Sequence, residues 1–261
     1  MTTSFPFYQV DAFSRRPFAG NPAAVVPMTA WPDDRLLQEI AAENNLSETA
    51  FLVPDGDGFR LRWFTPVAEV DLCGHATLAS ACVVFERLRP GSDRVAFSSQ
   101  SGPLFVARDG EKLVLDFPSK PPTPCAPPSG LDAALGAAPA EVHRGICLMA
   151  VYGSEGDVRD LRPDFALLAA CEPFGVIATA VGRECDFVSR FFAPAIGIPE
   201  DPVTGAAHCT LAPFWAARLG RQKLHARQVS RRGGELWVED LGDRVRIAGH
   251  AVLVIEGTLF V

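Results

Sequence analysis

The sequence predicts an α+β fold in which two pseudo-symmetric halves each wrap antiparallel strands around a central helix. Two observations predict this class: an internal repeat, and a proline-rich segment near the middle of the chain. The repeat aligns RWFTPVAEVDLCGHATLASACVVFERL at 62–88 with RFFAPAIGIPEDPVTGAAHCTLAPFWAARL at 190–219. A match of this length between two parts of one chain indicates a duplicated structural unit.

In each copy of the repeat, a short strand leads through an irregular loop to a glycine that opens an apolar helix. Arg62 matches Arg190, and Gly74 matches Gly205 after a three-residue insertion in the second copy. The pattern at 76–85 is apolar on all sides of the helix, so we expect this helix to be buried.

The segments before the two copies also correspond, because each is typical of a helix, a short loop and a strand. The first of these helices is expected to begin near Asp33, and the second has Asp164 in its first turn. Apolar runs bounded by turn residues predict further strands. These runs are YQVDAF at 8–13, AAVVP at 23–27, LFVAR at 104–108 and KLVLDF at 112–117.

The stretch FPSKPPTPCAPPSG at 117–130 carries six prolines. Proline fixes φ and lacks the backbone N–H, so this stretch favours an extended connector over a helix or a strand. We therefore expect an N-terminal half at 1–117, a connector at 118–129 and a C-terminal half at 130–261. The last strand is a candidate to cross back to the first half.

Composition and charge bound the class of protein. The apolar fraction is 48% and the charged fraction 21%, which is typical of a globular protein with a full core. A net charge of −7 argues against broad binding of nucleic acid. The sequence shows neither a signal-peptide pattern nor an apolar run long enough for a membrane span. Seven irregularly spaced cysteines do not form a disulfide framework, so we expect a reduced cytoplasmic protein.

The two glycine-led helices predict a binding site for a small acid. The first N–H groups of a helix have no intrahelical partner and attract anions, and glycine lets a ligand approach the backbone. If a pseudo-two-fold axis relates the halves, both helix starts can face one cleft, which would suit a substrate with a carboxylate. The alternative is that Gly74 and Gly205 only permit tight packing of helix against strand.

Three polar residues near these helix starts are candidates for chemistry. Glu48 begins an otherwise apolar strand, where a carboxylate could both take and give a proton. His75 follows the first glycine directly, and Asp201 lies before Pro202 near the second. Each also has a structural interpretation: an edge or capping carboxylate, a core histidine, and a turn residue.

Cys73 could be one of two racemase thiols, but Thr204 stands at the matching position of the second copy. A catalytic pair with His75 is disfavoured, because residues two apart on a helix do not face each other. A metal site is not predicted, because Cys73, His75, His208 and Cys209 lack a standard ligand spacing. No phosphate loop, nucleophile elbow or dinucleotide fingerprint is present, so no cofactor is expected.

Four ordered motifs carry a family resemblance: VDAFSRRPFAGNPAAVV, LSETAFL, DLCGHATLASA and EDPVTGAAH. Together they resemble the PhzF-like family, named for the phenazine-biosynthesis isomerase, whose fold is of the diaminopimelate epimerase type. The resemblance implies a cofactor-independent isomerase that shifts a proton on a small carboxylic acid, and it implies a homodimer.

The resemblance also implies roles for particular residues. It places the acid/base group on Glu48 and the other catalytic residues on His75 and Asp201. Ala206 stands where the phenazine enzyme has a serine, so this chain lacks that hydroxyl. The residues implied in substrate binding are Gly20, Asn21, Ser47, Gly74, Thr204, Gly205 and Ala206.

Two other functions stay open at this point. One is a one-thiol amino-acid racemase or epimerase that uses Cys73. The other is a binding protein that kept the fold without catalysis. The substrate is expected to be a small molecule with a carboxylate, with no nucleic acid and no membrane as partner.

Overall fold

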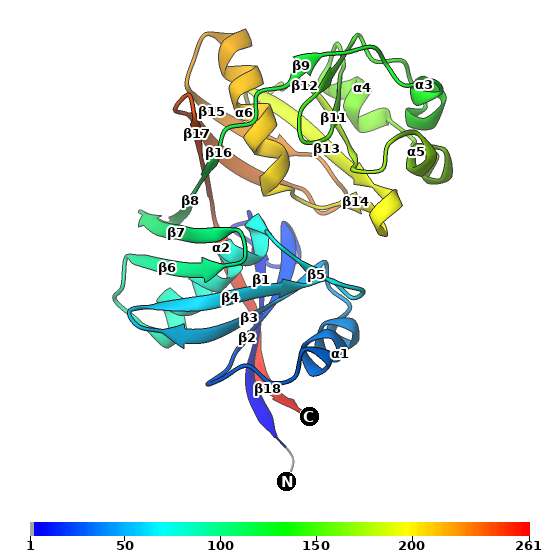
Figure 1. Ribbon diagram of the computed structural model, residues 1–261. Helices are drawn as coiled ribbons and strands as arrows, with labels where there is room; N and C mark the ends of the chain where they lie inside the picture. The colour runs from blue at the N-terminus through cyan, green and yellow to red at the C-terminus, as the bar shows by residue number, and fades with distance from the viewer. Residues whose placement is uncertain (1–2) are drawn as a thin grey trace. The chain divides into compact units, whose positions relative to one another are not determined.

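The structure is a computed structural model that describes residues 3–261, and the chain forms two compact units (Figure 1). Unit 1 comprises Met1–Asp116 and Ala248–Val261, and unit 2 comprises Phe117–Ile247. Both ends of the described chain therefore belong to unit 1. Within residues 3–261, no helix combines the length and the apolar character needed to cross a membrane.

Unit 1 contains two α-helices, a π-helical turn and most of its strands in the first 118 residues. In chain order these elements are β1 (Ser4–Ala12), β2 (Asn21–Pro27), α1 (Asp34–Asn44), β3 (Glu48–Asp55), β4 (Gly58–Phe64), β5 (Glu69–Val70), α2 (Gly74–Val83), η1 (Val84–Leu88), β6 (Arg94–Ser99), β7 (Gly102–Asp109) and β8 (Lys112–Pro118). The last element of the chain, β18 (Ala251–Phe260), returns to pair with β1 in antiparallel register.

Unit 2 has the same kinds of elements in a similar order. They are β9 (Thr123–Pro124), α3 (Leu131–Leu135), β10 (Glu141–Arg144), β11 (Leu148–Val151), α4 (Glu155–Asp160), α5 (Phe165–Cys171), β12 (Val176–Val181), β13 (Phe187–Ala193), η2 (Pro194–Ile196), β14 (Ile198–Asp201), α6 (Gly205–Leu219), β15 (Lys223–Gln228), β16 (Gly234–Asp240) and β17 (Arg244–Gly249). The connector predicted at 118–129 is irregular except for β9, which pairs with β10.

The strand pairings repeat from one unit to the other. In unit 1, β1–β2, β3–β4, β6–β7 and β7–β8 are antiparallel, whereas β2–β3 and β4–β6 are parallel. In unit 2, β10–β11, β12–β13 and β15–β16 are antiparallel, whereas β11–β12 and β13–β15 are parallel. The α+β class and the duplication are confirmed, and each half adds two parallel pairs that the sequence pattern did not indicate.

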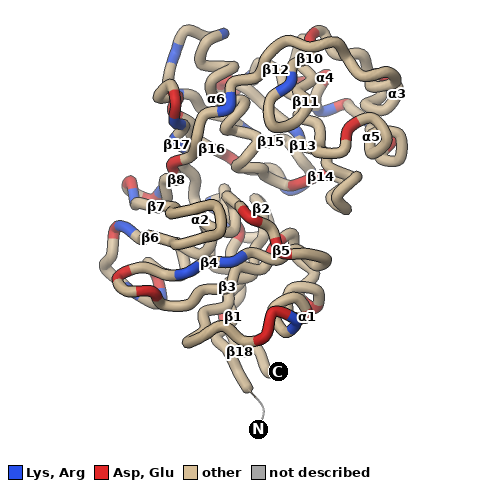
Figure 2. Tube along the Cα trace, viewed as in Figure 1, with Lys and Arg blue, Asp and Glu red and all other residues tan. Residues whose placement is uncertain are grey.

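The central helix of unit 1 is buried along its whole length. All ten residues of α2 are buried, and Figure 2 shows its trace without any Lys, Arg, Asp or Glu. A helix without a polar face can only be stable inside the protein, so the prediction for 76–85 is confirmed. The equivalent helix of unit 2, α6, is buried over most of its length and has Arg218 in its last turn.

The helices predicted from their acidic starts have the expected caps. Asp33 is the N-cap of α1 and accepts a hydrogen bond from the backbone N–H of Arg35. Asp164 is the N-cap of α5, one position before the predicted first turn, and accepts from the N–H groups of Ala166 and Leu167. Each carboxylate satisfies donors that the first helical turn leaves without partners.

Candidate active site

In unit 1, two neighbouring parallel strands begin at the same edge of the sheet and bring candidate residues together. Asn21 begins β2 and Glu48 begins β3, and the register pairs Ala23 with Glu48. The Ser47 hydroxyl donates a hydrogen bond to the Asn21 side-chain oxygen at 3.3 Å. The sheet therefore holds three of the predicted residues side by side.

The loop before Asn21 is shaped by Gly20. Gly20 has φ +70°, and a Cβ on it would lie 2.1 Å from the backbone oxygen of Ala12. Only glycine fits this close approach between β1 and the loop. The buried Asp11 carboxylate also holds the loop by accepting the backbone N–H of Phe18 at 2.7 Å. The structure thus gives Gly20 a backbone role in positioning Asn21.

The start of α2 supplies the histidine. Cys73 is the N-cap of this helix and has extended backbone angles of φ −140° and ψ 114°. Its carbonyl accepts both the backbone N–H and the hydroxyl of Thr77, at 3.2 and 2.5 Å. Gly74 and His75 then open the helix, and both are buried. These two hydrogen bonds fix the backbone at the start of the helix.

Glu48, His75 and Cys73 form one buried cluster. The His75 Nε2 atom lies 3.1 Å from Glu48 Oε2, and the Nδ1 atom lies 3.5 Å from the Cys73 sulfur. The side chains of His75 and Glu48 are only 6% and 12% exposed. The Nε2 and Oε2 atoms face each other without ideal hydrogen-bond alignment, so we treat this contact as a charge pair.

The contact between Cys73 and His75 corrects an expectation from the sequence. We expected residues two apart not to face each other, but that rule holds only for positions inside a helix. Cys73 precedes the helix and its extended backbone turns the side chain toward the ring of His75.

The charges of the cluster favour a protonated histidine beside a neutral thiol. Burial alone would lower the pKa of His75, but its negative neighbours raise that pKa well above its usual range. Burial raises the pKa of the Cys73 thiol, and the charge of Glu48 raises it further. The groups that raise the pKa of His75 are Cys73 first and then Glu48.

Among the described residues, these three could together hold a metal ion, because one ligand atom from each lies within 4.8 Å of the others. Cys73 contacts Nδ1 of His75 and Glu48 contacts Nε2, so the two side chains contact different nitrogens of the ring. That this cluster binds no metal stays a prediction from the sequence.

The candidate residues of unit 2 lie together at the start of α6. The Thr204 hydroxyl donates to the Asp201 carboxylate at 2.5 Å, and Thr204 is the N-cap of α6. Gln228 on β15 donates to the backbone oxygen of Asp201 and accepts the backbone N–H of Thr204, at 2.8 and 2.9 Å. Gly205 is buried and Ala206 is exposed in the first turn.

Gln228 is a residue that sequence reasoning missed. It is 1% exposed, and its amide also donates to the Thr204 hydroxyl at 3.1 Å. The amide therefore fixes the loop of Asp201 against the N-cap of α6. Nothing in the local sequence marks Gln228, because its importance comes from the parallel pairing of β13 and β15.

His208, the second histidine weighed as a metal ligand, is a core residue. Its Nδ1 atom donates to the backbone oxygen of Thr204 at 2.8 Å, and burial lowers its pKa to about 4. The ring is therefore neutral at physiological pH and lies against Phe187.

The two loops that lead to the helix starts are clamped in the same way. On β4, Arg62 binds both carboxylate oxygens of Glu69, each at 2.7 Å. On β13, the matching Arg190 binds both oxygens of Glu200 at 2.7 and 3.0 Å. The repeat aligns these two arginines, but the sequence alone gave them no role.

The register of the strands explains why only unit 1 has the glutamate. Phe64 and Phe192 are equivalent in the repeat, and they pair with Thr49 and Val176. The residue before Thr49 is Glu48, and the residue before Val176 is Gly175, as the alignment predicted. Gly175 has φ +108°, and a Cβ there would lie 2.8 Å from the Phe191 ring. The two units are chemically asymmetric at this position.

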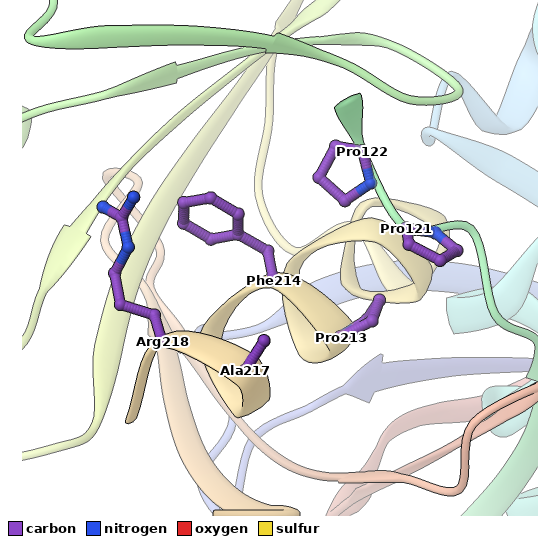
Figure 3. Close-up of a pocket in the computed structure, with 6 residues that line it drawn as sticks. All are labelled: Pro121, Pro122, Pro213, Phe214, Ala217 and Arg218. Atoms are coloured by element: carbon purple, nitrogen blue, oxygen red, sulfur yellow. The ribbon is translucent and has the colours of Figure 1, made fainter. Parts of the chain in front are cut away.

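Unit 2 also has a surface pocket of about 380 Å³ whose lining includes none of the candidate residues (Figure 3). It is lined by Pro121, Pro122, Pro213, Phe214, Ala217 and Arg218. The Arg218 guanidinium already binds Glu141 at 2.7 Å and stacks over Phe214. The pocket offers no further charged group, so it is a poor candidate for catalysis.

Comparison with known proteins agrees with this architecture. A family model described as phenazine biosynthesis-like protein matches residues 10–257. An uncharacterized isomerase of Pseudomonas aeruginosa is 55% identical over 254 residues, which cover 97% of each chain. A crystal structure of a PhzF-family phenazine biosynthesis protein from Enterococcus faecalis has a TM-score of 0.97 at 46% identity, covering 99% of this chain and 100% of that chain.

A more distant structure shows the same fold. A hydroxyproline epimerase from Agrobacterium vitis, solved with bound trans-4-hydroxy-L-proline, has a TM-score of 0.64 at 11% identity and covers 99% of this chain and 93% of its own. The family resemblance drawn from the four motifs is confirmed. The chain belongs to the phenazine biosynthesis-like family and is an isomerase.

Proposed function

We propose that Glu48 is the acid/base group of this isomerase and that it moves a proton between two carbons of a small carboxylic acid. The observation that carries the proposal is the contact of its buried carboxylate with His75 at 3.1 Å. The Glu48 carboxylate faces the imidazole ring at this distance, and in the proposal it begins the reaction as a base.

The two carboxylate oxygens of Glu48 are proposed to have different roles. Oε2 is buried and faces His75. Among the described residues, the ion-pair contact with His75 is made by Oε2 and not by Oε1. Oε1 is therefore the oxygen available to a substrate, while His75 fixes the orientation of the carboxylate.

The proposed reaction needs no other reactant. Glu48 removes a proton from one carbon of the substrate. The electron pair of that C–H bond forms a new double bond, and the π electrons of the substrate's existing double bond move to a second carbon. The protonated Glu48, whose proton exchanges with solvent, then delivers a proton to that second carbon and is again a carboxylate. Ser47, Asn21 and the start of α2 at Gly74 are proposed to bind the substrate. In unit 2, Asp201 remains a proposed catalytic residue, and Thr204, Gly205 and Ala206 remain proposed ligand-binding residues.

Deuterium transfer tests the proposal while the substrate is still unidentified. Small cyclic and aromatic carboxylic acids are first screened for thermal stabilisation of the protein, since a ligand of the folded state raises its Tm. Acids that bind are then incubated with the protein in D₂O, and uptake of deuterium at carbon is measured by mass spectrometry.

The Glu48→Gln variant is expected to lose at least about 100-fold in the rate of deuterium uptake while still binding the acid. Glu39→Gln is the matched control, because Glu39 is an exposed residue of α1. Uptake at the wild-type rate in Glu48→Gln would exclude Glu48 as the acid/base group.

The two other functions predict different results in the same assay. A one-thiol racemase would lose activity in Cys73→Ser, whereas proton transfer by Glu48 survives this change. The burial and raised pKa of Cys73 argue against a thiolate base. A binding protein without catalysis would be stabilised by an acid but would show no deuterium uptake with any of them.

A further inference from the structure

We propose that Cys73 is a positioning residue, whose thiol holds Nδ1 of His75 so that the ring always presents an N–H at Nε2 to Glu48. The catalytic meaning of this inference rests on the proposed function of Glu48. The positioning itself is a property of the protein without substrate.

Each nitrogen of the imidazole ring has its own neighbour. Nδ1 of His75 lies 3.5 Å from the Cys73 sulfur, and Nε2 lies 3.1 Å from the Glu48 carboxylate. His75 and Cys73 are 5% and 6% exposed. Water cannot easily replace either contact at such burial, so the orientation of the ring depends on these two side chains.

The backbone of Cys73 is itself held in place. Its carbonyl accepts two hydrogen bonds from Thr77, one from the backbone and one from the hydroxyl. Its extended angles direct the side chain toward the ring. Cys73 is therefore anchored independently of His75, as a residue must be in order to position another.

A thiol is suited to both protonation states of the histidine. When His75 is protonated, Nδ1–H donates to the sulfur, and Nε2 carries the proton nearer to the Glu48 carboxylate. When His75 is neutral, the thiol donates to Nδ1, and the remaining ring proton stays on Nε2. A hydroxyl can do the same, but an aliphatic side chain can do neither, and would leave Nδ1 buried without a partner.

Several other titratable groups near α2 have partners other than His75. This helix packs against β1, β2, β3, β18 and η1. These elements carry Tyr8, Asp11, Glu48, Asp55, Glu86, Arg87 and Glu256. Arg87 pairs with Glu256, and Asp11 accepts the Phe18 N–H. Among the described residues, the groups that act on the His75 pKa are Cys73 and Glu48.

Nitrogen NMR of the full-length, ¹⁵N-labelled protein tests the inference. Long-range ¹H–¹⁵N spectra distinguish the two neutral forms of a histidine and follow its titration. The variants are Cys73→Ser, which keeps a donor and acceptor, and Cys73→Ala and Cys73→Val, which do not. Cys82→Ala is the matched control, because Cys82 is a buried cysteine of the same helix that contacts Glu86 instead.

The wild type, Cys73→Ser and Cys82→Ala are expected to keep the neutral ring in the Nε2–H form. In Cys73→Ala and Cys73→Val, the Nδ1–H form becomes detectable, and the titration midpoint of His75 falls by about one pH unit. The corresponding limb of the pH profile for deuterium uptake shifts by the same amount. Two aliphatic variants are used so that the test survives if one of them fails to fold.

An unchanged ring form and midpoint in the aliphatic variants would overturn the inference. If the aliphatic variants change the tautomer of His75 but leave the pH profile of deuterium uptake unchanged, the proposed effect of Cys73 on catalysis would be overturned. Loss of activity in Cys73→Ser would also contradict it, because a positioning thiol is replaceable by a hydroxyl. Failure of the Glu48 proposal is distinct, because it appears as retained uptake in Glu48→Gln and leaves the NMR result standing.

Discussion

Gly20 shows how a single residue shapes the candidate site through its backbone. Its φ of +70° lies in the left-handed region, and the oxygen of Ala12 occupies the space that a side chain would need. Gly110 has a similar φ of +61° but has nothing within 4 Å of the equivalent position. Substitution of Gly110 therefore measures the free-energy cost of a side chain at positive φ alone. Substitution of Gly20 measures that cost plus the cost of the clash with Ala12.

We predict that Gly110→Ala lowers the free energy of unfolding by about 1 kcal/mol, because alanine is strained at positive φ. Gly20→Ala adds a clash with backbone and is expected to cost about 2–4 kcal/mol. Urea unfolding of the two variants and the wild type measures both values. Equal losses would show that the contact with Ala12 has no energetic weight.

At this scale the sequence identified candidate residues but not their contacts, and the roles of these residues stay predictions. Glu48, Ser47, Asn21 and His75 lie in one group, but the sequence carried no sign of Gln228. The contact of Cys73 with His75 was missed because the N-cap backbone, rather than helical periodicity, directs the thiol. Such contacts depend on strand register and local φ and ψ, which a single sequence does not specify.

At the scale of elements, the arginine clamps hold the loops before both central helices. Arg62 binds Glu69 through two parallel bonds, and its side chain is 17% exposed. It also stacks over Phe64, as Arg190 does over Phe192. A bidentate pair at partly buried positions is stronger and more directional than an exposed ion pair.

We predict that Arg62→Lys lowers the free energy of unfolding by about 1–2 kcal/mol, because lysine cannot form the two parallel bonds or the stacking contact. Arg35→Lys is the control, because Arg35 forms an exposed pair with Glu39 on α1 and should unfold like the wild type. Chemical denaturation compares the variants. An equal effect of both changes would mean that the clamp adds nothing beyond a surface pair.

At the scale of the whole molecule, the repeat in the sequence predicted two related folding units, and their strand pairings agree element by element. The parallel pairs were not predicted, because alternation of apolar residues gives strands without their directions. The return of β18 to β1 was anticipated only as a candidate. The shared cleft and the homodimer stay predictions.

The pairing of β18 with β1 makes a final prediction about unit 1. The register covers Ser4 to Ala12, and Leu259 packs with the core that contains Phe51 and Leu37. Deletion of β18 would leave β1 without one of its two neighbours and expose part of that core. Unit 2 keeps its own core, which includes Phe192 and Leu168.

A chain ending at Gly249 is expected to lose the folded indole NMR signals of Trp31 and Trp63 in unit 1, while Trp215 and Trp237 of unit 2 keep theirs. A chain ending at Leu259 is the control, because it retains the β1 pairing from Phe5 onward and the packing of Leu259, and it should show all four signals at their folded positions. Single Trp→Phe variants assign the signals. Four dispersed signals in the shorter chain would mean that unit 1 folds without β18, and collapse of all four would mean that the units do not fold independently.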